Sequence, residues 1–186
     1  FVLQGGSLDL NGPAQVFNGL RVSTATAQNA NLVPDIGGTT INTSGTMATL
    51  GLAAASGSFS GSITGNVALV RSTTVTTYSD WNIYTANTYT GPTILNGGRT
   101  QLLGTATLSN TSSITINQAT LLLSNNNGTS ILDALVDDRI NDAAPITLRG
   151  GMIQYRARFG SEGTEVFGGL TLAQGELTVA WERAEQ

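Results

Sequence analysis

The chain has 186 residues and a formal net charge of −4, a length that suits one domain or one stretch of a longer repeat array. Only 11% of its residues are charged, and every cation is an arginine; because these arginines are scattered, we expect no nucleic-acid partner. The absence of cysteine and histidine removes cysteine-ligated zinc, iron–sulfur clusters, thiol nucleophiles and histidine-based catalysis.

The chain opens with a ten-residue pattern that recurs downstream. Residues 1–10 read apolar, any, apolar, polar, any, small, any, apolar, any, apolar, and similar segments occupy 93–102, 114–123, 146–155 and 170–179. Alternate apolar residues point to one side of a strand, and a small residue between two short strands permits a corner. Each segment therefore predicts a strand, a corner and a second strand of one coil in a stack.

Residues 31–75 follow this pattern less closely. Strand-forming residues and glycines still dominate, with no linker and no shift in composition. We expect inward-facing side chains here at Ile41, Met47, Leu50, Phe59, Ile63, Val67, Leu69 and Val70.

The longest insertion between copies lies between Leu123 and Ile146. Its apolar spacing over 130–140 is compatible with one short helix lying across the stack. The predicted fold is therefore all-β: a single right-handed parallel β-helix (β-solenoid) over residues 1–186, with at most one short helix near 130–140. It forms one continuous domain or a segment of a longer repeat array.

One stretch of the sequence resembles a known repeat. Residues 87–98, beginning N-T-Y-T-G, resemble the autotransporter-associated β-strand repeat, and residues 5–12, 57–65, 140–148 and 167–172 also resemble autotransporter passenger sequences. Thr100 departs from the repeat, which usually has an apolar residue there, so that coil is expected to be less well packed. The resemblance implies a non-catalytic β-solenoid displayed on the surface of a Gram-negative-type bacterium as a stalk, adhesin or scaffold.

Carboxylates are the side chains of this sequence that could most plausibly act in catalysis or bind a metal. Asp133, Asp137, Asp138 and Asp142 lie close together and could bind Ca²⁺ or act as acid and base, but the calcium-loop patterns are missing. The stretch 137–139 is better interpreted as a solvated turn with local pairing. We expect no metal, no cofactor and no catalytic residue.

Four aromatic residues also gather in one region, at Tyr78, Trp81, Tyr84 and Tyr89. They could form a platform on which a sugar stacks, or they could cover a corner of the solenoid; the structural interpretation is favoured. Asparagines in glycosylation sequons, at positions 42, 110 and 127, are expected to form turns and side-chain ladders.

A third cluster would suit an enzyme. Arg156 and Arg158 are two residues apart and would lie on the same face of a strand. This spacing favours a solvated strand face. With Glu162 and Glu165 they loosely match a polysaccharide-acting β-helix enzyme, the least favoured function.

The favoured function is an extracellular structural or adhesive module at the bacterial cell surface. The alternative is a filament subunit, because no polar cap protects the predicted coil edges. Its partners would be neighbouring coils of the same or another copy, or a surface glycan or protein, without insertion into a membrane. End-to-end stacking would use Phe1, Val2, Leu3, Leu177, Val179 and Trp181.

Overall fold

A computed structural model describes residues 6–18, 38–53, 57–73, 80–125, 135–158 and 163–183. This part of the chain is all-β and contains no helix. The prediction of a helix near 130–140 is wrong for residues 135–140, which are extended with an isolated β-bridge at Ile140; residues 130–134 lie outside the described ranges. No described segment has the length and apolar character of a membrane-crossing helix.

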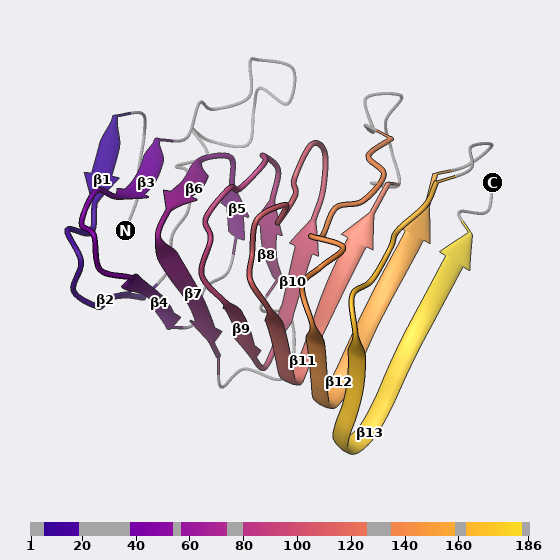
Figure 1. Ribbon diagram of the computed structural model, residues 1–186. Coiled ribbons are helices and arrows are strands. Elements are labelled where there is room, and N and C mark those ends of the chain that lie inside the picture. Colours follow the sequence, from indigo (N-terminus) through magenta and orange to yellow (C-terminus); the bar gives the residue numbers. More distant parts are fainter. Residues whose placement is uncertain are drawn as a thin grey trace.

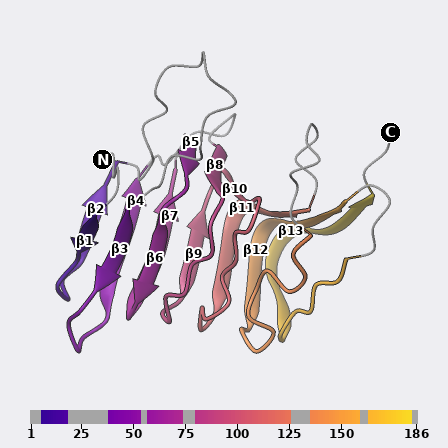
Figure 2. The same ribbon diagram turned by 90° about the horizontal axis from the view of Figure 1, so that it is seen from above.

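Thirteen strands are found in the described residues, and every pairing between them is parallel. Successive strands advance from β1 at one end of the molecule to β13 at the other (Figure 1; Figure 2). The strands are β1 (Ser7–Asp9), β2 (Gln15–Phe17), β3 (Thr39–Asn42), β4 (Ala48–Ala53), β5 (Gly57–Phe59), β6 (Ser62–Gly65), β7 (Val67–Ser72), β8 (Asp80–Ile83), β9 (Thr93–Asn96), β10 (Arg99–Leu102), β11 (Ile114–Ser124), β12 (Ile146–Ala157) and β13 (Leu170–Arg183).

The strands form three ladders around one core. The first runs β2-β4-β7-β9 into the first half of β11, and the second runs β5-β8-β10 into the second half of β11. Strands β12 and β13 continue both ladders, because each is long enough to pass through the corner. The third ladder is the sheet β1-β3-β6, and isolated parallel bridges join Asn87, Leu108 and Ile140.

The register of the first ladder confirms the starts of four of the five predicted copies. Thr93 pairs with Ile114, Ile114 with Ile146, and Ile146 with Leu170. The starts of the four predicted segments are therefore direct neighbours in the sheet. The uneven spacing between copies reflects loops of different length between strands that align at their starts. The predicted alignment is wrong in the second half of β13, where the pairing shifts by two residues and Ile153 pairs with Val179 in place of Leu177.

The copy assigned to residues 1–10 is wrong in its second half. That copy would place Ser7–Asp9 in the ladder of β10, but these residues form β1, which pairs with β3 in the separate three-stranded sheet. Residues 1–5 lie outside the described ranges. A short alternation such as Leu8 and Leu10 fits any of the three ladders, so the pattern alone could not select one.

The core collects inward side chains from all three ladders into one cluster that extends from Leu10 to Ala157. Five of the predicted inward residues between 31 and 75 are confirmed as buried: Leu50, Phe59, Ile63, Val67 and Leu69. Ile41, Met47 and Val70 were predicted wrongly, because Ile41 and Val70 are only half-buried and Met47 is exposed. In β3 the inward positions belong to Thr40 and Asn42.

The predicted corner between paired strands is present, and it requires an unusual backbone. Gly97, Gly150 and Gly175 have φ values of 74°, 71° and 81°, in the left-handed region that favours glycine. Gln118 occupies the same corner of β11 with a φ of 49°, as a non-glycine exception.

Polar side chains support the irregular third ladder by binding backbone amides. Asn42 Oδ1 accepts the N–H groups of Gly12 and Ser44 at 3.0 and 3.1 Å, and Asn87 Oδ1 accepts that of Ile63 at 2.9 Å. Asn42 therefore serves a turn, as predicted for the sequon asparagines. The sequon asparagine at position 110 is exposed and donates to a backbone carbonyl at 3.4 Å, and position 127 lies outside the described ranges.

Thr100 is buried and contacts a buried arginine. Arg71 of β7 is fully buried, and its Nη1 donates to Gly97 O at 3.2 Å and to Thr100 Oγ1 at 3.4 Å. Burial lowers the pKa of Arg71 to about 10, so the guanidinium remains charged at neutral pH. The repeat usually has an apolar residue at position 100. The Thr100 hydroxyl instead supplies a hydrogen-bond acceptor for the guanidinium of Arg71 on another strand.

Candidate functional site

One polar cluster surrounds a buried arginine. Arg139 is fully buried, and its guanidinium donates to Ala106 O at 2.7 Å and to Gly104 O at 2.9 Å. It also donates twice to Asn125 Oδ1, at 2.7 and 3.1 Å. Asn125 also donates to Tyr155 Oη at 2.9 Å. One hydrogen-bonded network therefore connects the segments that follow β10 and β11 with strand β12.

Glu165 completes this cluster from the following turn. Its two carboxylate oxygens accept the backbone N–H groups of Arg139 and Ile140 at 2.8 and 2.9 Å. Burial raises the pKa of Glu165 to about 7, and the nearby charge of Asp138 adds to this, while the two amides and the Arg139 charge oppose it. Both oxygens are used to join adjacent turns, so this glutamate is a structural clamp in the arrangement described.

Glu165 predicts that stability depends on pH near neutrality. Its folded-state pKa of about 7 lies above the ordinary 4.5. Its contribution to the free energy of unfolding is therefore fully present below pH 4.5 and is lost as the pH rises through 7. Ionisation of this half-buried group should cost on the order of 1–2 kcal/mol, allowing for solvent screening. We expect the Tm to fall by roughly 2–8 °C between pH 5 and 8, measured by circular dichroism.

Glu165→Gln should remove that part of the pH dependence, because an amide does not ionise. Glu176→Gln, on the exposed corner of β13, is the matched control and should keep the slope. An unchanged slope in Glu165→Gln would contradict the assignment.

The aspartates near residue 137 bind backbone groups of the next turn. Asp137 Oδ1 accepts the N–H of Thr164 at 3.0 Å, and Asp138 Oδ1 accepts that of Val166 at 3.3 Å. In the described ranges, no group of three or more His, Cys, Asp or Glu side chains could hold a metal ion. Asp142 is exposed, and the position of Asp133 is outside these ranges. Local pairing of these aspartates with Arg139 was predicted wrongly, since Arg139 turns inward to Asn125.

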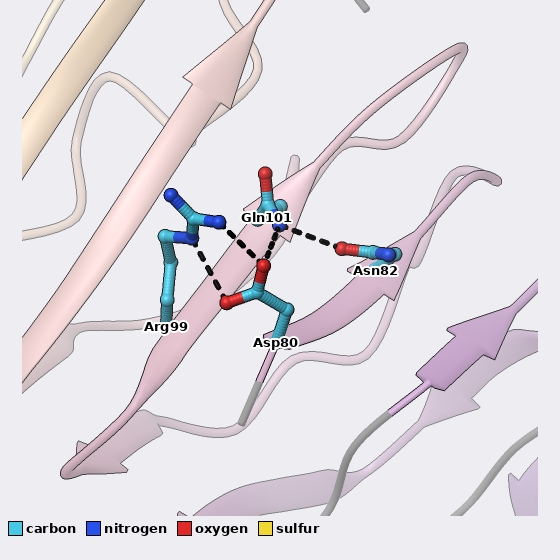
Figure 3. A network of polar contacts seen from close by, with 4 residues as sticks. All are labelled: Asp80, Asn82, Arg99 and Gln101. Atoms are coloured by element: carbon cyan, nitrogen blue, oxygen red, sulfur yellow. Dashed lines mark hydrogen bonds and ion pairs between the residues drawn. The ribbon is translucent and has the colours of Figure 1, made fainter. Parts of the chain in front are cut away.

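A second polar network lies on the outer face of β8 and β10 (Figure 3). Arg99 forms an ion pair with Asp80, with Nε at 3.0 Å from Oδ1 and Nη2 in contact with Oδ2. Gln101 Nε2 donates to the same carboxylate at 3.0 Å and to Asn82 Oδ1 at 2.8 Å. The network binds neighbouring turns together and leaves neither Arg99 nor Asp80 as an unpaired charge.

The aromatic residues of this group that the structure describes do not form a sugar-binding platform. Trp81 and Tyr89 are buried, and Trp81 stacks on Phe59 with ring centroids 6.0 Å apart. Tyr84 is half-buried, and Tyr78 lies outside the described ranges. The structural interpretation is therefore confirmed for Trp81 and Tyr89.

Tyr89→Phe tests the buried hydroxyl of this aromatic residue. The hydroxyl lies 2.5 Å from Thr93 Oγ1, which is also 2.9 Å from Thr111 Oγ1. Because Thr93 keeps its second partner, removal of the hydroxyl should cost only about 1 kcal/mol in a urea titration. A loss above about 3 kcal/mol would show that this network depends on the tyrosine more than its geometry indicates.

Two of the residues considered for an enzyme site have other partners. Arg156 pairs with Glu182 of β13 at 3.1 Å, while Glu165 binds the amides described above. Arg156 and Arg158 are half-exposed and flank the buried Ala157, as the predicted alternation requires. Glu162 lies outside the described ranges.

An open groove of about 630 Å³ follows the corner of β11, β12 and β13. Its lining combines small corner residues, including Gly150 and Gly151, with mostly polar side chains. The pairing of β12 with β13 is irregular here, with register shifts on both sides of Arg149. The larger side chains that line it are Gln118, Thr120, Arg149, Met152, Gln174, Glu176 and Thr178.

The predicted stacking residues that the structure describes lie on β13. Val179 and Trp181 are more than half exposed, whereas Leu177 is partly buried against the core. Trp181 stacks on Tyr155 of the preceding turn with ring centroids 4.1 Å apart. Phe1, Val2 and Leu3 lie outside the described ranges.

Comparison with protein-family models, with curated proteins and with solved structures finds no match.

Proposed function

We propose that this chain is a non-catalytic structural or adhesive module of an extracellular bacterial surface protein, built as one right-handed parallel β-solenoid. The observation that carries the proposal is the shared register of Thr93, Ile114, Ile146 and Leu170 in successive strands. Parallel strands in such a stack lie about 4.8 Å apart, and continuous backbone ladders make a stiff rod. Right-handed connections are the strong preference between parallel strands.

The polar clusters support a structural role for this chain. Arg139, Asp80 and Glu165 each connect neighbouring turns through their hydrogen bonds. Because these groups hold the stack together, they are not arranged as an acid and a base around a common substrate space. The extracellular bacterial location rests on the resemblance of residues 87–98 to the autotransporter-associated repeat.

Electron microscopy of the purified protein, combined with a turnover screen, tests the proposal. We expect short, uniform rods and no turnover of acidic or neutral polysaccharides. A compact globular particle, or measurable turnover of any substrate, would overturn the proposal.

End-to-end assembly is the second candidate, and the apolar face of β13 favours it. Leu172 and Trp181 are each 60% exposed, although their counterparts on β12, Leu148 and Tyr155, are buried. A following turn of the same polypeptide or a second copy could cover this face. Filaments that lengthen with protein concentration would support assembly between copies, whereas isolated rods at every concentration would exclude it.

A further inference from the structure

The last strand of the described stack, β13, pairs with β12 in a register that changes at the corner. Before the corner, Leu148 pairs with Leu172. After the corner, Gly151 pairs with Leu177, so the pairing has shifted by two residues. Strands β11 and β12 cross the same corner in one constant register. β13 therefore bulges at its corner, and its other edge pairs with no strand of the described part of the chain.

A pairing without this shift, which we call the regular register, would also place apolar side chains inward. Sliding a strand by two residues keeps each side chain on its own face of the sheet. In the observed pairing, the buried residues Ile153, Tyr155 and Ala157 of β12 face Val179, Trp181 and Arg183. In the regular register they would face Leu177, Val179 and Trp181. The regular register thus places an apolar residue, in place of an arginine, opposite the buried Ala157.

Gly175, at the corner of β13, fits either register. In the observed pairing it continues the column of left-handed corner residues, with a φ of 81° next to 71° at Gly150. The regular register would move Gln174 into that column. Gln118 of β11 shows that a glutamine can hold this conformation, since its φ is 49° at the same corner.

The next column at the corner consists of small residues. Ala119 pairs there with Gly151, and a Cβ added to Gly151 would lie 2.2 Å from Ala119 O, so the space between the turns is narrow. In the observed pairing, Leu177 follows Gly151 in this column. The regular register would bring Gly175 there and keep the column small. One glycine thus serves two competing positions, and neither register satisfies the whole corner.

The contacts that hold β13 in the observed register also have an alternative. Trp181 stacks on Tyr155 with ring centroids 4.1 Å apart. Glu182 forms an ion pair with Arg156 at 3.1 Å. The regular register would place Glu182 opposite Arg158, a cation that forms no ion pair in the described part of the chain. Glu182 can therefore exchange one arginine for the other when the strand slides.

We propose that β13 is a two-register strand, whose second half slides by two residues between the observed bulged register and the regular register while its first half stays paired with β12. The bulged register interrupts the open edge of the stack, and bulged edges resist the addition of another strand. The regular register removes this interruption. The slide is thus a conformational switch at the end of the described stack, and it does not depend on whether copies of the chain assemble.

Competition between two disulfides in one variant measures the two registers, because the chain has no native cysteine. The variant carries Gln154→Cys, Thr178→Cys and Ala180→Cys. Residues 154 and 180 are direct partners in the observed register, and 154 and 178 would be partners in the regular one. Partners lie about 5 Å apart, whereas residues two positions out of register lie about 8 Å apart, beyond the limit of roughly 7 Å for a disulfide. After equilibration in a glutathione buffer, peptide mapping by mass spectrometry should find both disulfides, with 154–180 the more abundant.

Two arginine variants in this cysteine background distinguish sliding from fraying of the strand. Arg156→Ala removes the ion pair of the observed register and should raise the ratio of the 154–178 to the 154–180 disulfide about twofold at low salt. Arg158→Ala, the matched control, removes the arginine that Glu182 would face in the regular register and should lower that ratio about twofold. Absence of the 154–178 disulfide, or a ratio that stays constant or moves in the same direction in both variants, would overturn the inference.

Discussion

Arg139→Ala is expected to destabilise the protein by about 3–5 kcal/mol, which corresponds to a fall in Tm of roughly 6–20 °C. The arginine is fully buried and donates to two backbone carbonyls and to Asn125. Alanine would leave the carbonyls of Gly104 and Ala106 and the Asn125 amide oxygen without these donors, and would leave a cavity. Urea titration followed by circular dichroism measures the loss.

Two further arginine variants make this expectation specific. Arg139→Lys keeps the charge but cannot reproduce the planar set of donors, so it should lose an intermediate amount of stability. Arg149→Ala, at an exposed position, should change stability by less than about 0.5 kcal/mol. Equal effects of alanine at 139 and 149 would contradict the role of Arg139 as the centre of a buried cluster.

Gly151→Ala is expected to cost about 4 kcal/mol or more, because two effects act at one corner. Gly151 has a φ of 104°, which a residue with a side chain adopts only under strain. An added Cβ would also lie 2.2 Å from Ala119 O and 2.8 Å from Ala119 N, both in the backbone of the neighbouring turn. Strand β11 would have to move away, which would disturb its pairing with β12 at this corner.

Alanine substitutions at two other glycines separate the effect of backbone strain from that of steric collision with the adjacent strand. Gly150→Ala combines a φ of 71° with a nearest contact of 3.5 Å to the side chain of Gln118, so backbone strain of about 1–2 kcal/mol should dominate. Gly169→Ala meets nothing within 4 Å and should change stability by less than about 0.5 kcal/mol. The free energy of unfolding should therefore fall most at 151, less at 150 and least at 169; any other order would contradict the corner geometry.

The repeated strand–corner–strand pattern could be predicted because its physical causes are local. Alternating apolar residues determine which side of a strand is buried, and a column of small residues marks the corner. These features gave the register of Thr93, Ile114, Ile146 and Leu170 directly. The third ladder could not be predicted in the same way, because side chains such as Asn87 and Glu165 replace part of its regular strand pairing.

The buried cations were the largest omission. The sequence around Arg139 reads as a solvated turn, since two aspartates precede it, and only the fold brings Asn125 and two carbonyls to its guanidinium. Arg71 left one useful indication: Thr100 is a polar residue at an inward position. A polar residue in an apolar column implies a buried partner on an adjacent turn, and here that partner is Arg71.

Spin labelling of paired cysteines tests the stacked register most directly, because the chain has no native cysteine. Thr115 and Thr147 are half-exposed register partners on adjacent turns, whereas Thr171 continues the same column one turn further. Labels at Thr115→Cys and Thr147→Cys should lie about 5 Å apart along the stack and show strong spin exchange in their electron paramagnetic resonance spectrum. Labels at Thr115→Cys and Thr171→Cys, about 10 Å apart, should show only weaker dipolar broadening. Absent exchange in the first pair, or stronger coupling in the second, would contradict the parallel stack on which the proposed rod depends.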